Sequence, residues 1–191
     1  MKLFIFSTLL STLFLAACSN SNSTTSPAEA TQNTDTTASV TSSEKTKPAP
    51  ADAIIKGYLQ LKNALVADDD KAAAEAGNVI TKAMASFDKS ALSADQAKIY
   101  NDIEAGVKEH AGHIGENVGN IHHQREHFES LSQDIYDLAK AVGTGQKLYF
   151  DHCPMYNDNK GANWISETKE IQNPYLGKSM PTCGSLKEEF N

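Results

Sequence analysis

Two short stretches near the C-terminus, DHCPM and SMPTCG, hold the residues with the most distinctive chemistry. Each stretch contains a cysteine with a methionine at most three positions away. Thiolate and thioether sulfurs are soft donors that select Cu(I) over hard cations, and a nearby imidazole can replace one of them. If the two stretches converge, they form a soft-metal site. Its candidate ligands are Cys153, Met155, Met180, Cys183 and His152.

A disulfide between Cys153 and Cys183 is the competing interpretation. It would close a loop of about thirty residues and stabilise the fold by roughly 3–4 kcal/mol in the chain-entropy model. Both interpretations need the same geometry, because cysteines close enough to share an ion are close enough to oxidise. Two of the four methionines lie beside these cysteines, which favours a metal role. Core filling is the alternative use of methionine, so the sequence leaves the choice open.

Histidines form a second candidate site. Five of the six histidines lie between residues 110 and 127. His123 and His127 are four residues apart and project from the same side of a predicted helix. With His113 and Glu116 near the preceding turn, they could bind a divalent metal through imidazole and carboxylate. A polar, solvated helix face explains the same residues, so His123 and His127 are secondary metal candidates.

An enzymatic role ranks behind these two. Cys153 with His127 or His152 could in principle make a nucleophile and its base. The sequence contains no Walker loop, dinucleotide fingerprint or GxSxG motif, and nothing in it indicates an oxyanion hole or a substrate pocket. We therefore expect a protein that is not an enzyme.

The element that must position the histidines is a helical body over residues 51–145. Apolar side chains at 4-3-4 spacing predict a helix over 52–67. The aspartates of ADDDK then start a second helix, whose alanine-rich face suits close helix packing. Its expected buried stripe is Ala72, Ala76, Val79, Ala83 and Phe87, flanked by Ile80 and Met84.

The stretch SADQ at 93–96 has the form of a capping box and predicts the start of a third helix. Four glycines follow between residues 106 and 119. Each glycine disfavours a helix by roughly 1 kcal/mol, which predicts a break near 112–116. A fourth helix should then run to about Val142. Four helices with short connections predict an up-down four-helix bundle. The apolar stripe of the third helix is Tyr100, Ile103 and Val107, and that of the fourth is Val118, Ile121, Arg125, Phe128, Ser132 and Ile135.

Arg125 is the odd member of the fourth stripe. A guanidinium does not deprotonate in proteins, so at a covered position it must be paired or hydrogen-bonded. A C-terminal segment folded against this helix could supply carboxylates or carbonyls. We interpret Arg125 as a structural clamp, ahead of a ligand-binding role.

Residues 146–191 show little helical periodicity. Aromatic residues cluster there with glycines and prolines, which predicts an irregular cap, with a short strand or two, packed on the bundle in the same domain. Because the helical body over 51–145 is about twice as long as this cap, the folded part is expected to be mainly α. The aromatic residues are Tyr149, Phe150, Trp164 and Tyr175.

The N-terminal residues predict export. The apolar run within residues 1–17 is shorter than the roughly 20 residues that span a bilayer. It ends in LAAC, which resembles the lipobox of bacterial lipoproteins and implies cleavage before Cys18 and lipid on its thiol. Residues 18–50 should be a disordered tether, since 15 of the 32 residues from 19 to 50 are Ser or Thr. Ser19 in place of an aspartate favours the outer membrane of the cell envelope.

The net charge is −7, or −8 without Lys2 of the signal segment. An acidic chain with scattered lysines argues against nucleic acid and against an anionic membrane surface as partners. We therefore expect the lipid on Cys18 to be what holds the protein at the membrane.

Five stretches taken together carry a family resemblance. They are YLQLKNALVADD (58–69), QREHFESLS (124–132), LYFDHCPM (148–155), GANWIS (161–166) and IQNPYLGKSMPTCG (171–184). They resemble a family of envelope domains of unknown function in Bacteroidetes-type bacteria, which also occurs fused to periplasmic adaptor subunits of copper and heavy-metal efflux systems. The resemblance covers nearly the whole folded part and implies a metal-handling context, with efflux components as partners.

The sequence and the resemblance together predict a lipid-anchored envelope protein that binds a soft metal, Cu(I), in metal handling or efflux. The alternative is a non-catalytic structural or interaction module, in which the two C-terminal cysteines form a stabilising disulfide.

Overall fold

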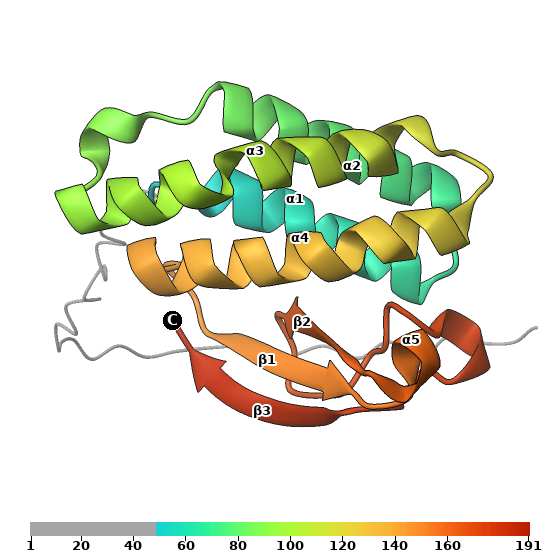
Figure 1. Cartoon of the computed structure of the whole chain (residues 1–191). Coiled ribbons are helices and arrows are strands. Elements are labelled where there is room, and N and C mark those ends of the chain that lie inside the picture. Colours follow the sequence, from blue (N-terminus) through green and yellow to red (C-terminus); the bar gives the residue numbers. More distant parts are fainter. Residues whose placement is uncertain (1–48) are drawn as a thin grey trace, which may run out of the picture. The chain divides into compact units, whose positions relative to one another are not determined.

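The computed structural model describes residues 49–191. The predicted signal peptide at 1–17, the lipid-bearing Cys18 and all but the last two residues of the predicted tether lie outside this range. The described part is mainly helical, with a small antiparallel sheet at its C-terminal end (Figure 1). No helix in it is both long and apolar enough to cross a membrane. The four long helices are α1 (Asp52–Val66), α2 (Asp70–Ala85), α3 (Ala94–Glu116) and α4 (Ile121–Val142), with a 3-10 turn η1 (Lys89–Ala91) between α2 and α3.

Three of the four long helices begin at a residue whose side chain accepts a hydrogen bond from the first turn. Asp69 caps α2 and Asn120 caps α4, each by accepting from the backbone amide three residues further on. Ser93 and Gln96 make both bonds of the predicted capping box before α3. These bonds satisfy amides that a helix leaves unpaired, so the polar residues fix where each helix starts.

Consecutive helices pack against one another, α1 on α2, α2 on α3 and α3 on α4 (Figure 1). The approach of α2 to α3 depends on Gly77, because a Cβ there would lie 2.7 Å from the Ala111 carbonyl oxygen. The predicted helix break at 112–116 is wrong, since α3 continues to Glu116 and the chain turns at residues 117–120. Tertiary packing offsets the low helix propensity of the glycines in α3.

Two residues of the predicted apolar stripes point to solvent. Val79 is 42% exposed, and Val118 lies in the turn before α4 and is 54% exposed. The alanine-rich sequence of α2 fits two neighbouring faces about equally well, and the structure uses the face that includes Ile80 and Met84. The buried residues of α2 are Ala73, Ala74, Ala76, Gly77, Ile80 and Met84.

The C-terminal region contains a three-stranded antiparallel sheet, so it is more regular than the predicted cap with a short strand or two. The strand order is β2-β1-β3, so β1 is the central strand. The strands have only five or six residues each, which is too short for an alternating pattern to stand out among glycines and prolines. The elements are β1 (Leu148–Cys153), α5 (Tyr156–Asn159), β2 (Ala162–Ser166), η2 (Gly177–Ser179) and β3 (Ser185–Phe190).

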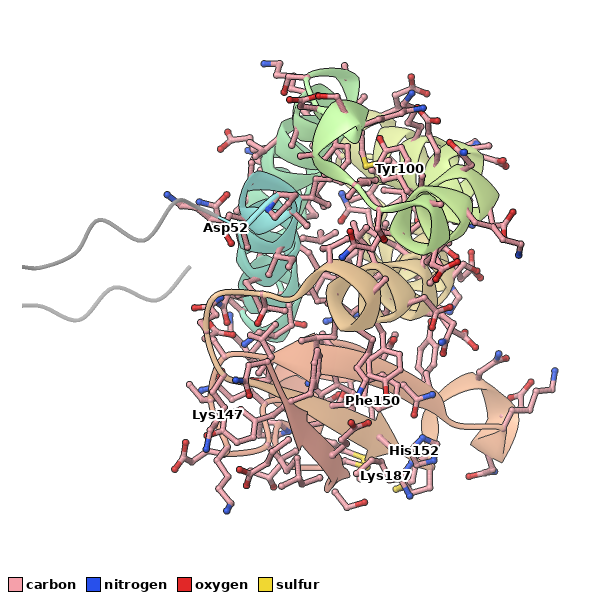
Figure 2. The ribbon with its side chains drawn as sticks, turned by 90° about the vertical axis from the view of Figure 1, so that its left-hand side faces the viewer. Asp52, Tyr100, Lys147, Phe150, His152 and Lys187 are labelled. Atoms are coloured by element: carbon pink, nitrogen blue, oxygen red, sulfur yellow. The ribbon has the colours of Figure 1, made fainter. Side chains whose placement is uncertain are left out.

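Aromatic side chains join the sheet to the helices. Phe150 of β1 stacks on Tyr136 of α4 with ring centroids 4.0 Å apart. The buried Tyr58 hydroxyl of α1 lies 2.8 Å from Ser132 Oγ and accepts from the Ile165 amide of β2 at 3.0 Å. Figure 2 shows Phe150 in the sheet layer below the helices. The sheet is thus held against α1 and α4 by both apolar stacking and a buried hydrogen-bond network.

Candidate metal centres

The two cysteine-containing stretches meet at one end of the sheet. Cys153 is the last residue of β1 and fully buried, and Cys183 lies two residues before β3 and is partly buried. Their Sγ atoms are 3.2 Å apart. Both are free thiols at this separation, because a disulfide bond is about 2.05 Å long. The pKa of the Cys183 thiol is raised, first by its contact with Cys153 and then by burial, although a hydrogen bond from the Met155 amide opposes this.

Both neighbouring methionines are at the surface. Met155 is 49% exposed and Met180 is 38% exposed, so neither fills the core. Each is tied to Cys183 through its backbone: the Met180 carbonyl accepts from the Cys183 amide at 3.2 Å, and the Met155 amide donates to the Cys183 sulfur. The structure therefore brings both methionine backbones next to the thiol pair.

His152, the fifth predicted soft-site residue, lies apart from the thiols. Successive side chains of a strand point to opposite faces, so His152 and Cys153 lie on different faces of the sheet. The Nδ1 atom of His152 is 2.8 Å from the Oδ1 of its cross-strand partner Asn163. Figure 2 shows His152 in the sheet layer. The side chain of His152 therefore contacts β2 and not the thiol pair.

Arg125 reaches from α4 to both the α1–α2 turn and the C-terminal segment. Its Nε donates to the Pro174 carbonyl at 2.7 Å, and its Nη2 donates to the Leu65 carbonyl at 2.8 Å and to Asp68 Oδ1 at 2.5 Å. The side chain is only 12% exposed. These are the carboxylate and carbonyl partners that a covered guanidinium requires.

Asp68 and Gly177 adapt to this contact. Burial acts to raise the pKa of Asp68, but hydrogen bonds from Arg125 and from the Lys178 amide, together with their charges, lower it overall. Gly177 has φ +51°, and a Cβ there would lie 1.9 Å from Asp68 Oδ1. Only a glycine therefore lets the C-terminal segment pass this close to the ion pair.

Four imidazoles gather where the second half of α3 lies beside the first half of α4. The His113 and His127 rings stack nearly parallel with centroids 4.4 Å apart, and the His123 ring is edge-on to His127 at 4.5 Å. One ligand nitrogen from each of these three residues can be chosen so that all lie within 4.8 Å of one another. Glu116, which the sequence grouped with them, is the exposed last residue of α3 and is not in this group.

Two further residues complete this histidine cluster and escaped the sequence prediction. His110 Nδ1 lies 3.0 Å from His127 Nδ1, and Glu126 Oε2 lies 3.0 Å from His123 Nδ1. The signal for His110 is its three-residue spacing from His113, which places both on one face of α3. The pKa of His127 is lowered, first by burial and then by the positive charge that the neighbouring imidazoles carry when protonated.

A buried charged group in the sheet also escaped the prediction. Asp151 of β1 is fully buried, and neither carboxylate oxygen has a hydrogen-bond partner among residues 49–191. Burial raises its pKa from 3.8 to about 7, although the charge of Lys62 opposes this. Lys62 is itself fully buried, with its Nζ 2.9 Å from Glu167 Oε2. Asp151 lines neither of the two hollows beside α4 that border Met155 or Tyr136.

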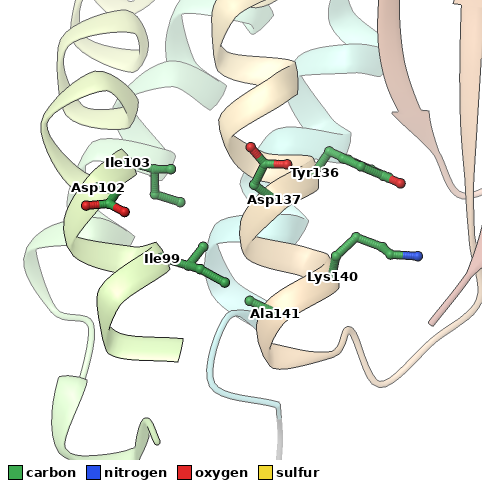
Figure 3. A pocket seen from close by; sticks show the side chains of 7 residues that line it. All are labelled: Ile99, Asp102, Ile103, Tyr136, Asp137, Lys140 and Ala141. Carbon is green, nitrogen blue, oxygen red and sulfur yellow. The ribbon is translucent and has the colours of Figure 1, made fainter. Parts of the chain in front are cut away.

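Two of the surface hollows beside α4 bear on the candidate centres. One, of about 580 Å³, lies between α4 and α5 and is lined by both Glu126 and Met155, so it borders both candidate centres. The other, of about 470 Å³, is a groove between α3 and α4 nearer the start of α3 (Figure 3). Ile99, Tyr136 and Lys140 line this groove, and none of the candidate metal ligands does.

Residues 54–147 match a protein family described as a protein of unknown function (DUF3347). No curated protein and no solved structure matches the chain. The matched range contains Arg125 and the whole histidine cluster. The thiol pair, the two exposed methionines and His152 lie beyond this range, as does the LYFDHCPM stretch of the predicted resemblance.

Proposed function

We propose that the protein is a lipid-anchored envelope protein that binds a soft metal ion, Cu(I), through Cys153 and Cys183. The observation that carries the proposal is the 3.2 Å separation of the two thiol sulfurs beside two exposed methionines. A role in metal handling or efflux, with heavy-metal efflux components as partners, belongs to the same proposal. So does an up-down arrangement of the four helices.

The separation of the thiols is closer to that of two metal ligands than to that of a disulfide. A tetrahedral ion with metal–sulfur bonds of about 2.3 Å holds its sulfurs about 3.8 Å apart. Binding an ion would therefore move the thiols apart by about 0.6 Å from their 3.2 Å contact, whereas a disulfide would draw them together by about 1.1 Å. Cys183 lies in a loop segment and can make the smaller adjustment more readily.

The exposure of Met155 and Met180 supports the same conclusion. Burying a methionine side chain stabilises a fold by about 1.5–3 kcal/mol, so two methionines left at the surface forgo that gain. Thioethers are soft, uncharged donors that suit Cu(I). Two exposed thioethers beside a thiol pair could receive an ion from solution or from another protein.

A structural staple is the second candidate, and the burial of Cys153 at the end of β1 favours it. In an oxidising envelope the two thiols could pass two electrons to an external oxidant, release two protons and form a disulfide. That bond would fix the segment before β3 to the central strand. A protein in this form could not bind an ion through these sulfurs.

Titration of Cu(I) separates the two functions. The full chain carrying Cys18→Ser is reduced, its free thiols are counted, and Cu(I) is added without oxygen against a competing chelator. We expect one ion per chain with sub-micromolar affinity. Cys153→Ser should weaken binding by more than about 100-fold, and Met155→Leu combined with Met180→Leu by about 10-fold. Met84→Leu, at a buried methionine of α2, is the matched control and should leave binding unchanged.

Two results would overturn the proposal. One is that the fully reduced protein does not bind Cu(I) while protein taken from cells contains a quantitative Cys153–Cys183 bridge. The other is that Cu(I) binding survives loss of both thiols. The first result would leave the staple as the function of the pair.

A further inference from the structure

The histidine cluster lies outside this sulfur chemistry and needs its own explanation. Imidazoles at a helix surface ordinarily point to solvent, yet here residues from α3 and α4 turn toward one another. His127 is in the middle: its Nδ1 lies 3.0 Å from His110 Nδ1, and its Nε2 lies 3.2 Å from His123 Nε2. His122, on the same helix turn, instead has a side chain that is 78% exposed. The cluster is therefore specific to four of the five histidines of this region.

Buried hydrogen bonds fix the helix ends that carry these rings. Gln124 is fully buried, and its Nε2 donates to the Asp70 carbonyl at 2.9 Å and to the Ile114 carbonyl at 3.2 Å. One side chain thus ties together the start of α2, the end of α3 and the start of α4. The Asn120 cap holds the His123 amide at 3.2 Å. The backbone of the cluster is therefore set before any ligand arrives, as a binding site requires.

The distance between the two Nε2 atoms matches the spacing of two ligands on one ion. Imidazole nitrogens bind Zn²⁺ at about 2.0–2.1 Å, so two of them on a tetrahedral ion lie about 3.3 Å apart. His123 Nε2 and His127 Nε2 lie 3.2 Å apart. An ion could therefore bind to both atoms with almost no change in their separation.

The partner of the other ring nitrogen of His123 favours a tautomer that is ready to bind a metal. Glu126 Oε2 accepts hydrogen bonds, so the His123 Nδ1 atom 3.0 Å away carries a proton and its Nε2 presents a lone pair. The Nε2 atoms of His123 and His127 lie 3.2 Å apart, so in the metal-free protein His127 Nε2 donates its proton to this lone pair, and a bound ion would take the place of that proton. A carboxylate or imidazole that orients a ligating histidine in this way is the usual second layer of protein metal sites.

His113 is placed to supply the third nitrogen. Its ring stacks on His127, and its ligand nitrogen lies within 4.8 Å of those of His123 and His127. Moving it to ligand distance requires a displacement of at most about 1.5 Å, which an exposed side chain achieves by a change of rotamer. A site made of three histidines keeps a fourth position open to solvent.

We propose that His113, His123 and His127 form a second, independent site that binds a divalent first-row ion, Zn²⁺ or Cu²⁺. Imidazole suits such borderline ions, whereas the thiol pair suits softer ones. His110 and Glu126 are positioning residues that hold the rings through their Nδ1 atoms.

The test uses the full chain with all three cysteines replaced by serine, because thiols reduce Cu²⁺ and bind Zn²⁺ themselves. Zn²⁺ and Cu²⁺ are titrated separately against a competing chelator, and bound Cu²⁺ is examined by electron paramagnetic resonance for coupling to nitrogen. We expect one ion per chain with nitrogen coupling. His123→Gln with His127→Gln should weaken binding by more than about 100-fold, and Glu126→Gln by about 10-fold. His152→Gln, at a histidine of the sheet whose Nδ1 contacts Asn163, is the matched control and should change affinity less than about twofold.

His113→Gln keeps the test decisive if the double variant does not fold, because His113 is exposed and lies on the other helix. It should weaken binding by more than about 10-fold with an unchanged melting temperature. Failure of the cysteine-free chain to bind either ion would overturn the inference, as would binding that survives the loss of His123 and His127. Neither result bears on the Cu(I) proposal, because the sulfur ligands are absent from this experiment.

Discussion

The histidine cluster and the thiol pair differ in what holds their side chains together. The imidazoles project from two long helices, whose periodicity sets the spacing within each helix and whose packing sets the spacing between them. The thiols sit at the end of a strand and in the segment that leads into β3. Cys183 is placed there by contacts with residues distant in sequence. The nitrogen site therefore depends on regular structure, and the sulfur site depends on specific anchors.

Two anchors hold the segment that carries Cys183. Asn173 is fully buried, and its Nδ2 donates to the Cys183 carbonyl at 2.6 Å while its Oδ1 accepts from the Tyr175 amide at 2.8 Å. Arg125 donates to the Pro174 carbonyl next to it. Because Arg125 belongs to α4, the helix that carries the histidine cluster also positions the loop of the sulfur site. A substitution at Arg125 should therefore affect the thiol pair and the histidine cluster differently.

Arg125→Leu is the variant with the largest expected effect. It leaves Asp68 without its ion partner and two backbone carbonyls without a donor, which should lower the free energy of unfolding by about 3–5 kcal/mol. Chemical denaturation measures this loss. Lys98→Leu removes an exposed pair on α3, with side chains 79% and 65% exposed, and should cost less than about 1 kcal/mol.

Arg125→Leu also tests whether the thiol pair and the histidine cluster are held independently of each other. We expect the rate at which a mild oxidant couples Cys153 to Cys183 to fall, because the segment carrying Cys183 loses an anchor. Cu²⁺ binding by a folded, cysteine-free Arg125→Leu chain should be retained. Equal loss at both centres would show that the loop and the helices are not separately held.

The helices were predictable because each is marked locally. Ser93 and Gln96 indicate the start of α3 by their own chemistry, and Arg125 is out of place on an apolar stripe, which indicates a partner. The sheet was not predictable in the same way. Its central strand contains Asp151 and His152, whose burial or pairing depends on β2 and on Lys62 of α1. No pattern within residues 148–153 reports those contacts.

The candidate sites show the same limit. His123 and His127 could be paired from their spacing, because one helix turn separates them. Their association with His113 and His110 depends on how α3 lies against α4, which spacing alone does not give. The convergence of Cys153 and Cys183 was a hypothesis about two loops. The 3.2 Å contact agrees with the geometry that both the metal and the disulfide interpretations required.

Asp151→Asn tests, through the pH dependence of stability, whether the sheet buries a charge that the helices do not. In the folded state burial raises the pKa of Asp151 from 3.8 to about 7, so its contribution to stability is full below pH 3.8 and is lost as pH rises through 7. Removing the charge should therefore stabilise the protein near pH 8, by an amount on the order of 3 kcal/mol, and have little effect near pH 4. Thermal unfolding at the two pH values measures the difference. An equal change in stability at pH 8 and at pH 4 would mean that Asp151 is not a buried charge at pH 8.

Gln124→Met is the helical counterpart of the arginine variant. Methionine preserves the volume but leaves the Asp70 and Ile114 carbonyls without their donor, which should destabilise the fold by about 1–3 kcal/mol. We expect weaker Cu²⁺ binding at the histidine cluster and an unchanged rate of thiol coupling. Gln133→Met, at an exposed position of the same helix, is the matched control. Loss of thiol coupling in Gln124→Met would contradict the separation of the two regions.

His127→Gln has the smallest expected effect on the apoprotein and tests the sign of its pH dependence. The pKa of His127 is lowered from its ordinary value of 6.5, first by burial, then by His113, His123 and His110, against an opposing effect of Glu126. The unfolded chain therefore takes up this proton first as pH falls, so the stability that His127 contributes is full above pH 6.5 and is lost below it. Replacing His127 should flatten this fall by less than about 1 kcal/mol. Saturating Zn²⁺ should enlarge the slope in the wild type and leave the variant unchanged, because protons and the ion compete for the same nitrogens. A zinc-independent slope that persists in the variant would place the pH response in another part of the molecule.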